Sequence, residues 1–486
     1  MTGKPDPKGL AVCEEVKGDE MQGHEPKDMD TELDLLSNRA RASGAERIEN
    51  VAHLLSPANL KECLGRLKRK RASGTDGVTL EKYEEVAEEA LPELVERMKR
   101  MSYKPQPVRR VYIPKANGKM RPLGIPAVED KVVQCGMTRI LEAVYEADFL
   151  DCSYGFRRGR GCHQALRKVD EAIMKHPVNH VIEADIKGFF DNVSHDWMLK
   201  FIGHRIADRK FQHLVERFLK AGYMEEGKLY ATEGGTPQGG VISPVLANVY
   251  LHYVLDLWME RKVKEECRGY VEMVRYADDF VICVQYKDDA ERILSELKER
   301  LAKFGLELAE EKTRRIEFGR YARQNAEAKG CKPESFDFLG FTYYIGKTRN
   351  GAFKVGMKTS RKKLNAKLKE MTQWIKGVRN LLPLKDLWKT LKAKLAGHFQ
   401  YFGVSGNYRE IRTYYNRVLS IILKWLNRRS QKKSFSRKTY GAYLKRYPLP
   451  TPKIHHDFYG LKCLFVNVTE EPYVGNLQVR FCERKL

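Results

Sequence analysis

The chain has 486 residues, and at roughly 150 residues per domain this length predicts about three structural units. Hydrophobic residues make up 42% and charged residues 31% of the sequence, a balance that fits a globular protein and excludes a fully disordered chain or a membrane protein. Lys and Arg number 88 against 64 Asp and Glu, a net charge of +24. Such an excess points to a polyanionic partner, either nucleic acid or an anionic membrane surface.

The positive charge is concentrated in one segment. Residues 361–450 hold 23 Lys and Arg and only three acids, a net charge of +20. The first 34 residues hold four Lys against ten acids, and we expect an acidic disordered leader over residues 1–40. No apolar stretch has the length of a membrane span or the order of a secretion signal. We therefore expect no membrane partner and a cytoplasmic, nucleoid-associated protein. The ten Cys residues form no CxxC pair and are expected to be reduced thiols.

The first half of the chain alternates helical and extended patterns. A helical pattern over 39–71 ends in the basic run 68–71, which is equally explained by a solvated helix end or by a nucleic-acid contact. An amphipathic helix is predicted over 80–101. Residues 109–115 predict a strand, 116–119 a turn, and MRPLGIP a returning strand. The result is a basic hairpin with Lys115, Lys119 and Arg121 near its tip.

Two later segments place acids at strand ends. Residues 179–199 begin as an apolar strand that ends at Asp185 and continue as a helix. Residues 271–284 predict two strands around the turn Ala277-Asp278-Asp279. Adjacent carboxylates repel one another unless a cation neutralises them, and Mg²⁺ prefers oxygen ligands. Together, Asp185 and the pair at the turn have the composition of a two-metal centre for phosphoryl transfer, although a pair of Asp residues alone is more often a solvated turn.

The second half of the chain becomes helical and basic. A helix is predicted from residue 290, and an aromatic strand pair over 336–345. Beyond residue 360, three helices with apolar stripes and basic outer faces predict a small bundle. The stripes are formed by Leu364, Leu368, Met371 and Ile375, by Leu384, Leu387, Trp388, Leu391 and Leu395, and by Val418, Ile421, Ile422 and Trp425.

The order of the motifs resembles the group II intron-encoded reverse transcriptase and maturase family. The resemblance covers about residues 50–450 and is carried by YADD at 276–279 together with further blocks in the family's order. These are ASGTDGVT at 72–79, IPKANGKMRPLGIP at 113–126, SYGFRRGRGCHQAL at 153–166, EADIKGFFDNVSHD at 183–196, GGTPQGGVISPVLANVYLHYVLD at 234–256, LELAEEKTR at 306–314, FDFLGFTY at 336–343, HFQYFGVS at 398–405 and KWLNRRSQKKSF at 424–435.

The resemblance implies roles for individual residues. Two Mg²⁺ ions, for which Mn²⁺ is a possible substitute, would be held by Asp185, Asp278 and Asp279 and by the carbonyl of Ile186. Nucleotide contacts are implied for Lys115 and Arg121 as a triphosphate clamp, for Phe190 as the steric gate with Phe189 as the alternative, and for Gln238 and Lys312. Template contacts are expected for Arg157, Arg158 and Arg160, with a charged loop as an equal alternative. Duplex and intron-RNA contacts are expected for Arg428, Arg429, Lys432 and Lys433.

The resemblance also implies an α+β, right-hand polymerase fold. We expect the leader over 1–40, an N-terminal extension and fingers over 41–175, a palm over 176–350, a thumb or domain X over 351–450, and a short tail over 451–486 that could bind DNA or add a strand at LKCLFVNV. Many members end in an HNH endonuclease with paired Cys and His metal ligands; here only about 36 residues follow position 450, with His455, His456, Cys463 and Cys482 but no CxxC pair, so we expect that domain to be absent.

The implied function is RNA-directed DNA polymerisation with maturase activity. The expected partners are group II intron RNA, an RNA template with a DNA primer, dNTPs and target DNA; the sequence leaves monomer or dimer undecided. Three alternatives remain: a splicing cofactor with an idle polymerase site, a domesticated enzyme serving DNA repair or phage defence, and, more remotely, a Mg²⁺-dependent nuclease.

Overall fold

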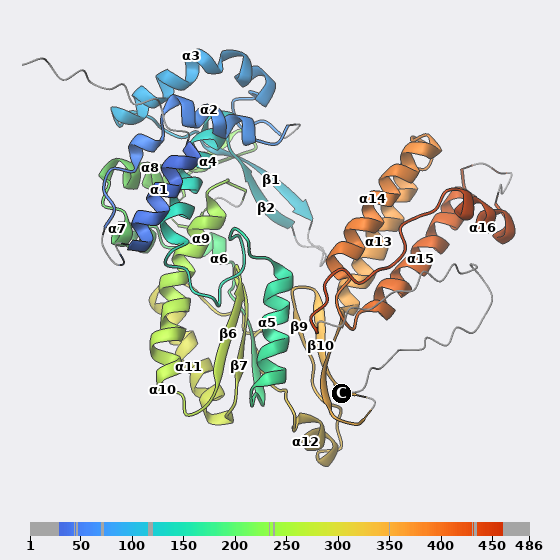
Figure 1. Ribbon diagram of the computed structural model, residues 1–486. Coiled ribbons are helices and arrows are strands. Elements are labelled where there is room, and N and C mark those ends of the chain that lie inside the picture. The colour runs from blue at the N-terminus through green and yellow to red at the C-terminus, as the bar shows by residue number, and fades with distance from the viewer. Residues whose placement is uncertain are drawn as a thin grey trace, which may run out of the picture.

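The computed structural model describes residues 29–459 except 43, 45–46, 70–71, 115–119, 233, 237–238, 349, 430 and 432–434 (Figure 1). The described residues combine many helices with sheets whose strand pairs are antiparallel with one exception, so the chain has the predicted α+β character. Within these described residues, none of the helices has both the length and the apolar character that a membrane span needs. The seven described Cys residues are free thiols.

The prediction of disorder over residues 1–40 is wrong for its last part. Helix α1 (Met29–Ala42) buries Met29, Leu33, Leu36 and Ala40, and it packs against α4 (Val128–Tyr145). The spacing of these four residues is helical, but the acidic composition of the segment obscured it. Residues 1–28 lie outside the described part of the chain.

The continuous helix predicted over 39–71 is divided in two. The chain leaves α1 at Ala42, forms a 3₁₀ turn (Ala52–Leu54), and enters α2 (Pro57–Arg66). Ser56 caps α2 by accepting a hydrogen bond from the Asn59 amide, and Pro57 occupies the first helical position. The cap and the proline start a new helix at residue 57, so the helical pattern predicted over 39–71 does not form one continuous helix. Helix α3 (Leu80–Lys99) agrees with the predicted helix over 80–101.

The predicted basic hairpin is confirmed. Strands β1 (Val108–Pro114) and β2 (Met120–Ile125) pair antiparallel, with Ile113 opposite Arg121. The base of β1 also pairs with β4 (Tyr223–Glu225), which continues to β5 (Lys228–Tyr230), giving the sheet order β2-β1-β4-β5. Residues 115–119, which include Lys115, lie outside the described residues.

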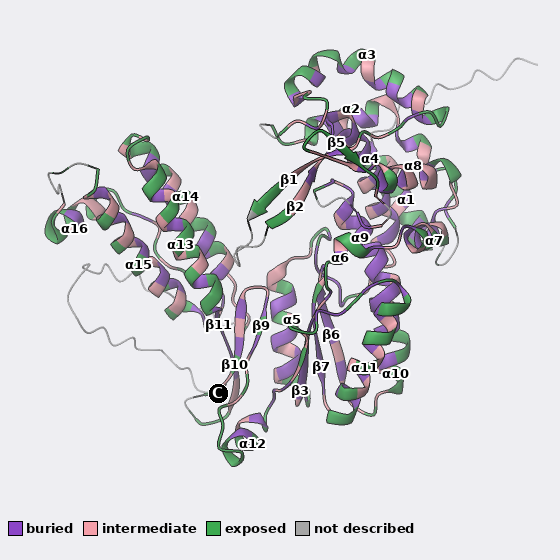
Figure 2. Ribbon diagram, turned by 180° about the vertical axis from the view of Figure 1, so that it is seen from behind, coloured by how far each residue is buried: buried purple, intermediate pink, exposed green. Residues whose placement is uncertain are grey.

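The central sheet has the order β6-β7-β3-β8, and every neighbouring pair is antiparallel. Its strands are β3 (His180–Asp185), β6 (Val271–Tyr276), β7 (Asp279–Val284) and β8 (Arg314–Glu317). Alternate residues of a strand point to opposite faces, and on β7 Ile282 belongs to the same hydrophobic cluster as Leu297 of α11 (Lys287–Lys303), whereas Val281 belongs to the cluster of Leu166 of α5 (Cys162–Lys175). Helices therefore cover both faces of this sheet (Figures 1 and 2).

Further helices surround the hydrophobic cluster that contains Ile282 and Leu297. The long segment after residue 242 contains two π-helical stretches between α-helical ends. The remaining elements of this region are α6 (Phe189–Asn192), α7 (His195–Arg205), α8 (Arg209–Lys220), α9 (Ser243–Leu251), the π-helical stretches (His252–Asp256 and Met259–Val263) and α10 (Lys264–Glu266).

The predicted three-helix bundle is confirmed. We call α13 (Arg361–Val378), α14 (Leu384–Phe402) and α15 (Tyr408–Leu426) the C-terminal bundle. A small sheet precedes the bundle and shares its hydrophobic cluster, so the bundle packs on the α5 side of the central sheet. The elements of this junction are α12 (Ala322–Ala328), β9 (Phe336–Phe338), β10 (Phe341–Lys347) and β11 (Phe353–Thr359).

After α16 (Arg437–Arg446) the chain returns to the base of the bundle. The Ser405 amide donates to the carbonyl of His456 over 3.0 Å. One residue on, the carbonyl of Asp457 accepts from Arg167 of α5 over 3.0 Å, and the Tyr459 hydroxyl donates to Asp170 of α5 over 3.3 Å. The bundle is thus attached to α5 by this return segment (450–459) as well as by the small sheet. The predicted tail features beyond residue 459 lie outside the described chain.

Candidate active site

The structure brings the strand-end acids together. Asp185, the last residue of β3, lies directly opposite Asp279, the first residue of β7. Opposite residues of antiparallel strands project to the same face. Asp279 lies two residues before Val281, which belongs to the cluster of α5, so both acids face the side of α5 and the C-terminal bundle. Asp278 occupies the preceding turn position, after Ala277 with a φ of 58°.

Burial and neighbouring carboxylates disfavour the ionisation of Asp278 and Asp279. Partial removal from water, and then the charges of Asp278 and Asp185, raise the pKa of Asp279 to about 6, although Asp279 is an exposed residue. Burial, and secondarily the charge of Asp185, raises the pKa of Asp278, while Arg121 and Lys312 oppose this rise. An oxygen-rich, mutually repelling set of this kind fits a hard divalent cation. In the geometry described, however, no group of three His, Cys, Asp or Glu side chains among the described residues is arranged for metal binding.

The amine of Lys312 is bound to the carboxylate of Asp185 in this structure. Its amine forms an ion pair with Asp185 Oδ2 while its side chain stays 61% exposed, and the hydrogen bond to Asp185 raises the pKa of Lys312. The sequence placed Lys312 behind a bound triphosphate; the structure places it in direct contact with a predicted metal ligand. Ile186, the predicted main-chain ligand, is buried and forms an isolated bridge with Leu308.

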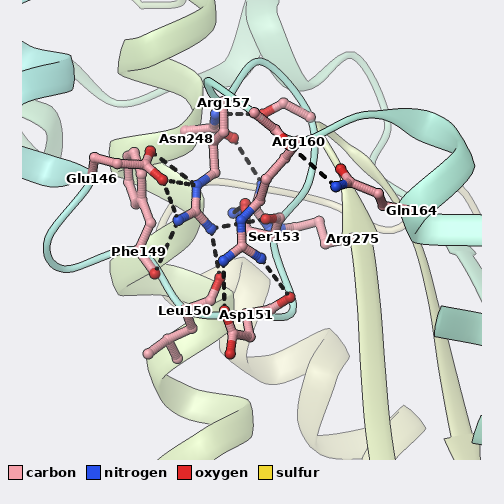
Figure 3. A network of polar contacts seen from close by, with 12 residues as sticks. Glu146, Phe149, Leu150, Asp151, Ser153, Arg157, Arg160, Gln164, Asn248 and Arg275 are labelled. Carbon is pink, nitrogen blue, oxygen red and sulfur yellow. Dashed lines mark hydrogen bonds and ion pairs between the residues drawn. The ribbon is translucent and has the colours of Figure 1, made fainter.

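A buried polar network supports the turn between β6 and β7. Arg275 donates to both oxygens of Asp256, at 2.7 and 2.5 Å, and neither side chain is exposed. It also donates to Ser153 Oγ over 2.7 Å and to Asn248 Oδ1 over 3.1 Å. A further hydrogen bond, of 3.0 Å, goes to the carbonyl of Ala277, the left-handed residue of the turn. Figure 3 shows Arg275 between Ser153 and Asn248.

Two phenylalanines follow Asp185 on α6 and face different ways. Phe189 is 2% exposed and stacks edge-on against Tyr250, whereas Phe190 is half-buried. The glycine-rich loop after residue 233 rests on Phe190, because the Thr236 amide donates to its carbonyl over 2.7 Å. Phe189 therefore belongs to the core, and of the two only Phe190 has a partly accessible ring.

The same loop contacts the hairpin. A Cβ added to Gly239 (φ 113°) would lie 2.5 Å from the carbonyl of Gly124 on β2, so only glycine permits this approach. Arg121, on β2, is near enough to Asp278 for its charge to lower the pKa of that acid. Gln238, predicted near the incoming nucleotide, lies outside the described residues, as does Lys115.

The three arginines predicted to contact the template differ. The Arg157 side chain is 2% exposed and pairs with Glu146 at 2.7 Å, and it donates to three main-chain carbonyls (Figure 3). This corrects the expectation of a template contact, because the guanidinium is fully engaged inside the protein. Arg158 is 65% exposed beside Glu142, and Arg160 pairs with Asp151; a surface role remains a prediction for these two.

The basic residues at the end of the bundle are only partly described. Arg428 lies over the ring of Trp425, 5.2 Å from its centroid, and Arg429 donates to the Leu382 carbonyl over 3.5 Å. Lys432 and Lys433 lie outside the described residues. The predicted RNA contacts of these four residues stay predictions.

The network around Arg275 was not predicted from the sequence. One feature of the sequence could have predicted this network: two polar residues, Asn248 and Asp256, interrupt the apolar helical segment VISPVLANVYLHYVLDLWM (241–259). Both are buried, and a buried charge requires a partner. No role was predicted for Phe156 either, although it lies inside the motif SYGFRRGRGCHQAL at 153–166.

The comparisons with known proteins agree with the geometry. Residues 113–343 match the family described as reverse transcriptase (RNA-dependent DNA polymerase). Over 474 residues the chain is 31% identical to the group II intron-encoded protein LtrA of Lactococcus lactis subsp. cremoris, covering 84% of this chain and 76% of LtrA. It is 39% identical over 212 residues to protein YkfC of Escherichia coli K12, covering 38% of this chain and 55% of YkfC. Nuclear intron maturase 3 of Arabidopsis thaliana is 25% identical over 238 residues, 45% of this chain and 31% of that protein.

Proposed function

Because the chain belongs to the reverse transcriptase family and is related to the group II intron protein LtrA, we propose that it is the reverse transcriptase of a group II intron. It extends a DNA primer on an RNA template and binds intron RNA as a maturase that promotes splicing and retrohoming into target DNA. The related protein is bacterial, and we propose that this chain acts in the bacterial cytoplasm at the nucleoid.

The observation that carries the polymerase proposal is the register of Asp185 opposite Asp279, with Asp278 beside them. These three carboxylates, with the Ile186 carbonyl, would hold two Mg²⁺ ions. When bound, such ions activate the primer 3′ hydroxyl and stabilise the leaving pyrophosphate. The raised pKa of Asp279, caused first by burial and then by the charges of Asp278 and Asp185, supports the assignment, because bound cations would offset that repulsion.

The surrounding groups suit a nucleoside triphosphate. Arg121 approaches Asp278 from the hairpin, and Lys312 already holds Asp185; with Lys115 they would bind the triphosphate by charge-assisted contacts. Phe190 would exclude a 2′ hydroxyl, and Gln238 would contact the nucleotide. We assign the fingers to 41–175, the palm to 176–350 and the thumb to 351–450, the last containing the C-terminal bundle.

The charge of residues 361–450, which contain the C-terminal bundle and α16, supports the RNA-binding part of the proposal. A net charge of +20 over residues 361–450 is self-repelling without a polyanion. Its exposed lysines and arginines suit the phosphates of a duplex, which they contact without reading sequence. We assign Arg428, Arg429, Lys432 and Lys433 to these contacts, both with the primer–template duplex and with intron RNA.

A double variant, D278N/D279N, tests the assignment. We expect loss of dNTP incorporation on an RNA template with a DNA primer, and retention of RNA affinity, because the bundle is unchanged. The matched control is D288N/D289N, an adjacent pair of acids at the start of α11, which should keep polymerase activity. Polymerisation by D278N/D279N would contradict the site, and intron splicing that proceeds equally with and without the protein would contradict the maturase role.

A further inference from the structure

Phe156 is a bulky residue in a backbone conformation that such residues avoid. Its φ is 57°, in the left-handed region that suits glycine. The residue is 49% exposed, so burial does not compensate for the conformation. Strained residues of this kind persist only where their surroundings fix them, and they cluster at functional sites.

On the N-terminal side, residue 156 is fixed by the β6–β7 hairpin. The Tyr154 amide donates to the Arg275 carbonyl over 2.9 Å, and the Arg275 amide donates to the Cys152 carbonyl over 2.8 Å. Gly155 rests against the turn itself, since an added Cβ would lie 2.4 Å from the Ala277 nitrogen. Asn248 holds the Gly155 carbonyl over 2.7 Å. The backbone leading to Phe156 is thus part of the active-site turn.

On the C-terminal side, Arg157 fixes the chain from within. Its guanidinium bonds the carbonyls of Leu150 and Ser153 at 2.7 and 2.9 Å and pairs with Glu146 (Figure 3). Two buried anchors therefore flank one exposed ring. This arrangement holds the Phe156 side chain outward, where it contributes little to the core.

The ring lies beside the acids. Its centroid is 6.4 Å from that of Tyr276, and Tyr276 lies directly opposite Asp279 in the hairpin. Tyr276 itself is only partly buried, against the hydrophobic cluster that contains the C-terminal bundle. The two rings therefore form an aromatic pair between the catalytic acids and the bundle.

We propose that Phe156, with Tyr276, forms a rigid aromatic platform that contacts the primer–template duplex at its growing end. Base and sugar faces pack on aromatic rings with little regard to sequence, as a polymerase requires. A platform fixed to the hairpin that carries Asp278 and Asp279 keeps the duplex end in register with those acids. The inference rests on the proposed polymerase function.

The duplex is favoured over the incoming nucleotide by position. The groups suited to a triphosphate, Arg121 and the loop of Gly239, are on the β2 side of the acids. Tyr276 instead packs against the hydrophobic cluster that contains the C-terminal bundle, together with Tyr401 of α14. The bundle, with its excess of positive charge, is where the duplex would lie.

Four variants of the full chain test the platform: F156G, F156A, F156Y and, as a control, Y321A, which removes an exposed ring beside α12. The probe is a fluorescent DNA primer annealed to an RNA template, and its Kd is measured by anisotropy in Mg²⁺. We expect about tenfold weaker binding for F156G and F156A, and binding within about twofold of the unmodified chain for F156Y and Y321A.

F156G separates function from packing, because glycine accepts the left-handed conformation. Its melting temperature should be unchanged or higher, and its KM for dNTP should be unchanged. Unaltered hybrid binding by F156G, or a raised dNTP KM as the only defect, would overturn the proposal. A lower melting temperature in F156G together with equally weak binding by F156Y would overturn it as well. If the unmodified chain fails to bind the hybrid, the proposed function fails too, which distinguishes the two failures.

Discussion

Arg275 and Asp256 form an ion pair that is completely buried, and the same guanidinium holds the carbonyl of Ala277. A buried ion pair is weak evidence of a net gain in stability, but removing one partner leaves the other charge uncompensated. The pair therefore links the stability of the fold to the shape of the turn that carries Asp278.

The variant R275M should lower the free energy of unfolding by about 3–5 kcal/mol, measured by urea denaturation. The double variant R275M/D256L removes both charges and should recover much of this stability. It should not recover primer extension, because the Ala277 carbonyl still lacks its donor. Equal recovery of stability and activity would show that the hydrogen bond to Ala277 has no positioning role.

Lys312 and Asp185 provide a second test. Because Lys312 is largely exposed, K312M should change the free energy of unfolding by less than about 1 kcal/mol. If the amine moves to the triphosphate when a nucleotide binds, the KM for dNTP should rise about tenfold, with little change in Kd for the primer–template. Steady-state kinetics with K298M, another exposed lysine paired to an acid, is the control. Equal KM values in K312M and K298M would exclude a nucleotide contact.

Phe189 and Phe190 form a matched pair of adjacent rings. Since Phe189 is buried, F189A should cost about 3–5 kcal/mol of stability. Phe190 is half-buried, so F190V should cost less and should instead reduce discrimination against ribonucleotides by about tenfold or more. Competition between dNTP and rNTP in primer extension measures the second effect. Unchanged discrimination in F190V would remove Phe190 from the nucleotide site.

His398 predicts acid sensitivity of the C-terminal bundle. Its ring stacks on Tyr414, its Nε2 has no hydrogen-bond partner among the described groups, and burial lowers its pKa from 6.5 to about 3. As the pH falls below 6.5, His398 becomes protonated in the unfolded chain but stays neutral in the folded chain. The free energy of unfolding therefore falls by up to about 1.4 kcal/mol per pH unit. Between pH 6.5 and about 5, this amounts to about 2 kcal/mol. Urea denaturation at both pH values should show that H398F loses less stability than the unmodified chain; an equal decrease would contradict the prediction.

The salt dependence of RNA binding tests the bundle. The double variant R428A/R429A should reduce the slope of log affinity against log salt by about 0.7–0.9 for each phosphate that the two arginines neutralise in the unmodified chain. The comparison variant is R323A, an arginine of α12 that pairs with Glu327 on its own helix. An unchanged slope in R428A/R429A would place the RNA elsewhere.

Local patterns predicted the elements that local interactions determine. The β6–β7 hairpin and the helices of the C-terminal bundle follow from alternation and apolar stripes, and the opposition of Asp185 and Asp279 follows from two strand ends meeting in one sheet. Helix α1 was missed because its acidic charge, taken as a sign of disorder, outweighed its four apolar positions.

Pairings between distant elements could not be predicted. Arg157 has the same charge as its neighbour Arg158, and only the position of Glu146 makes one a core residue and the other a surface residue. In the same way, the sequence does not show that Arg275 is a buried residue, because its partner Asp256 is brought beside it only by the fold. The left-handed backbone of Phe156 is also invisible in sequence, because it is imposed by contacts on either side.

The return segment determines how the C-terminal bundle can move. A bundle joined to the central sheet by one strand could swing in any direction. This bundle is held through several contacts: by the small sheet before α13, by the hydrogen bond of His163 on α5 to the Tyr401 carbonyl of α14 over 2.8 Å, and by the contacts of the return segment with α5. Because these contacts join the bundle to α5 at several separate points, any movement of the bundle relative to the central sheet has to shift all of them together.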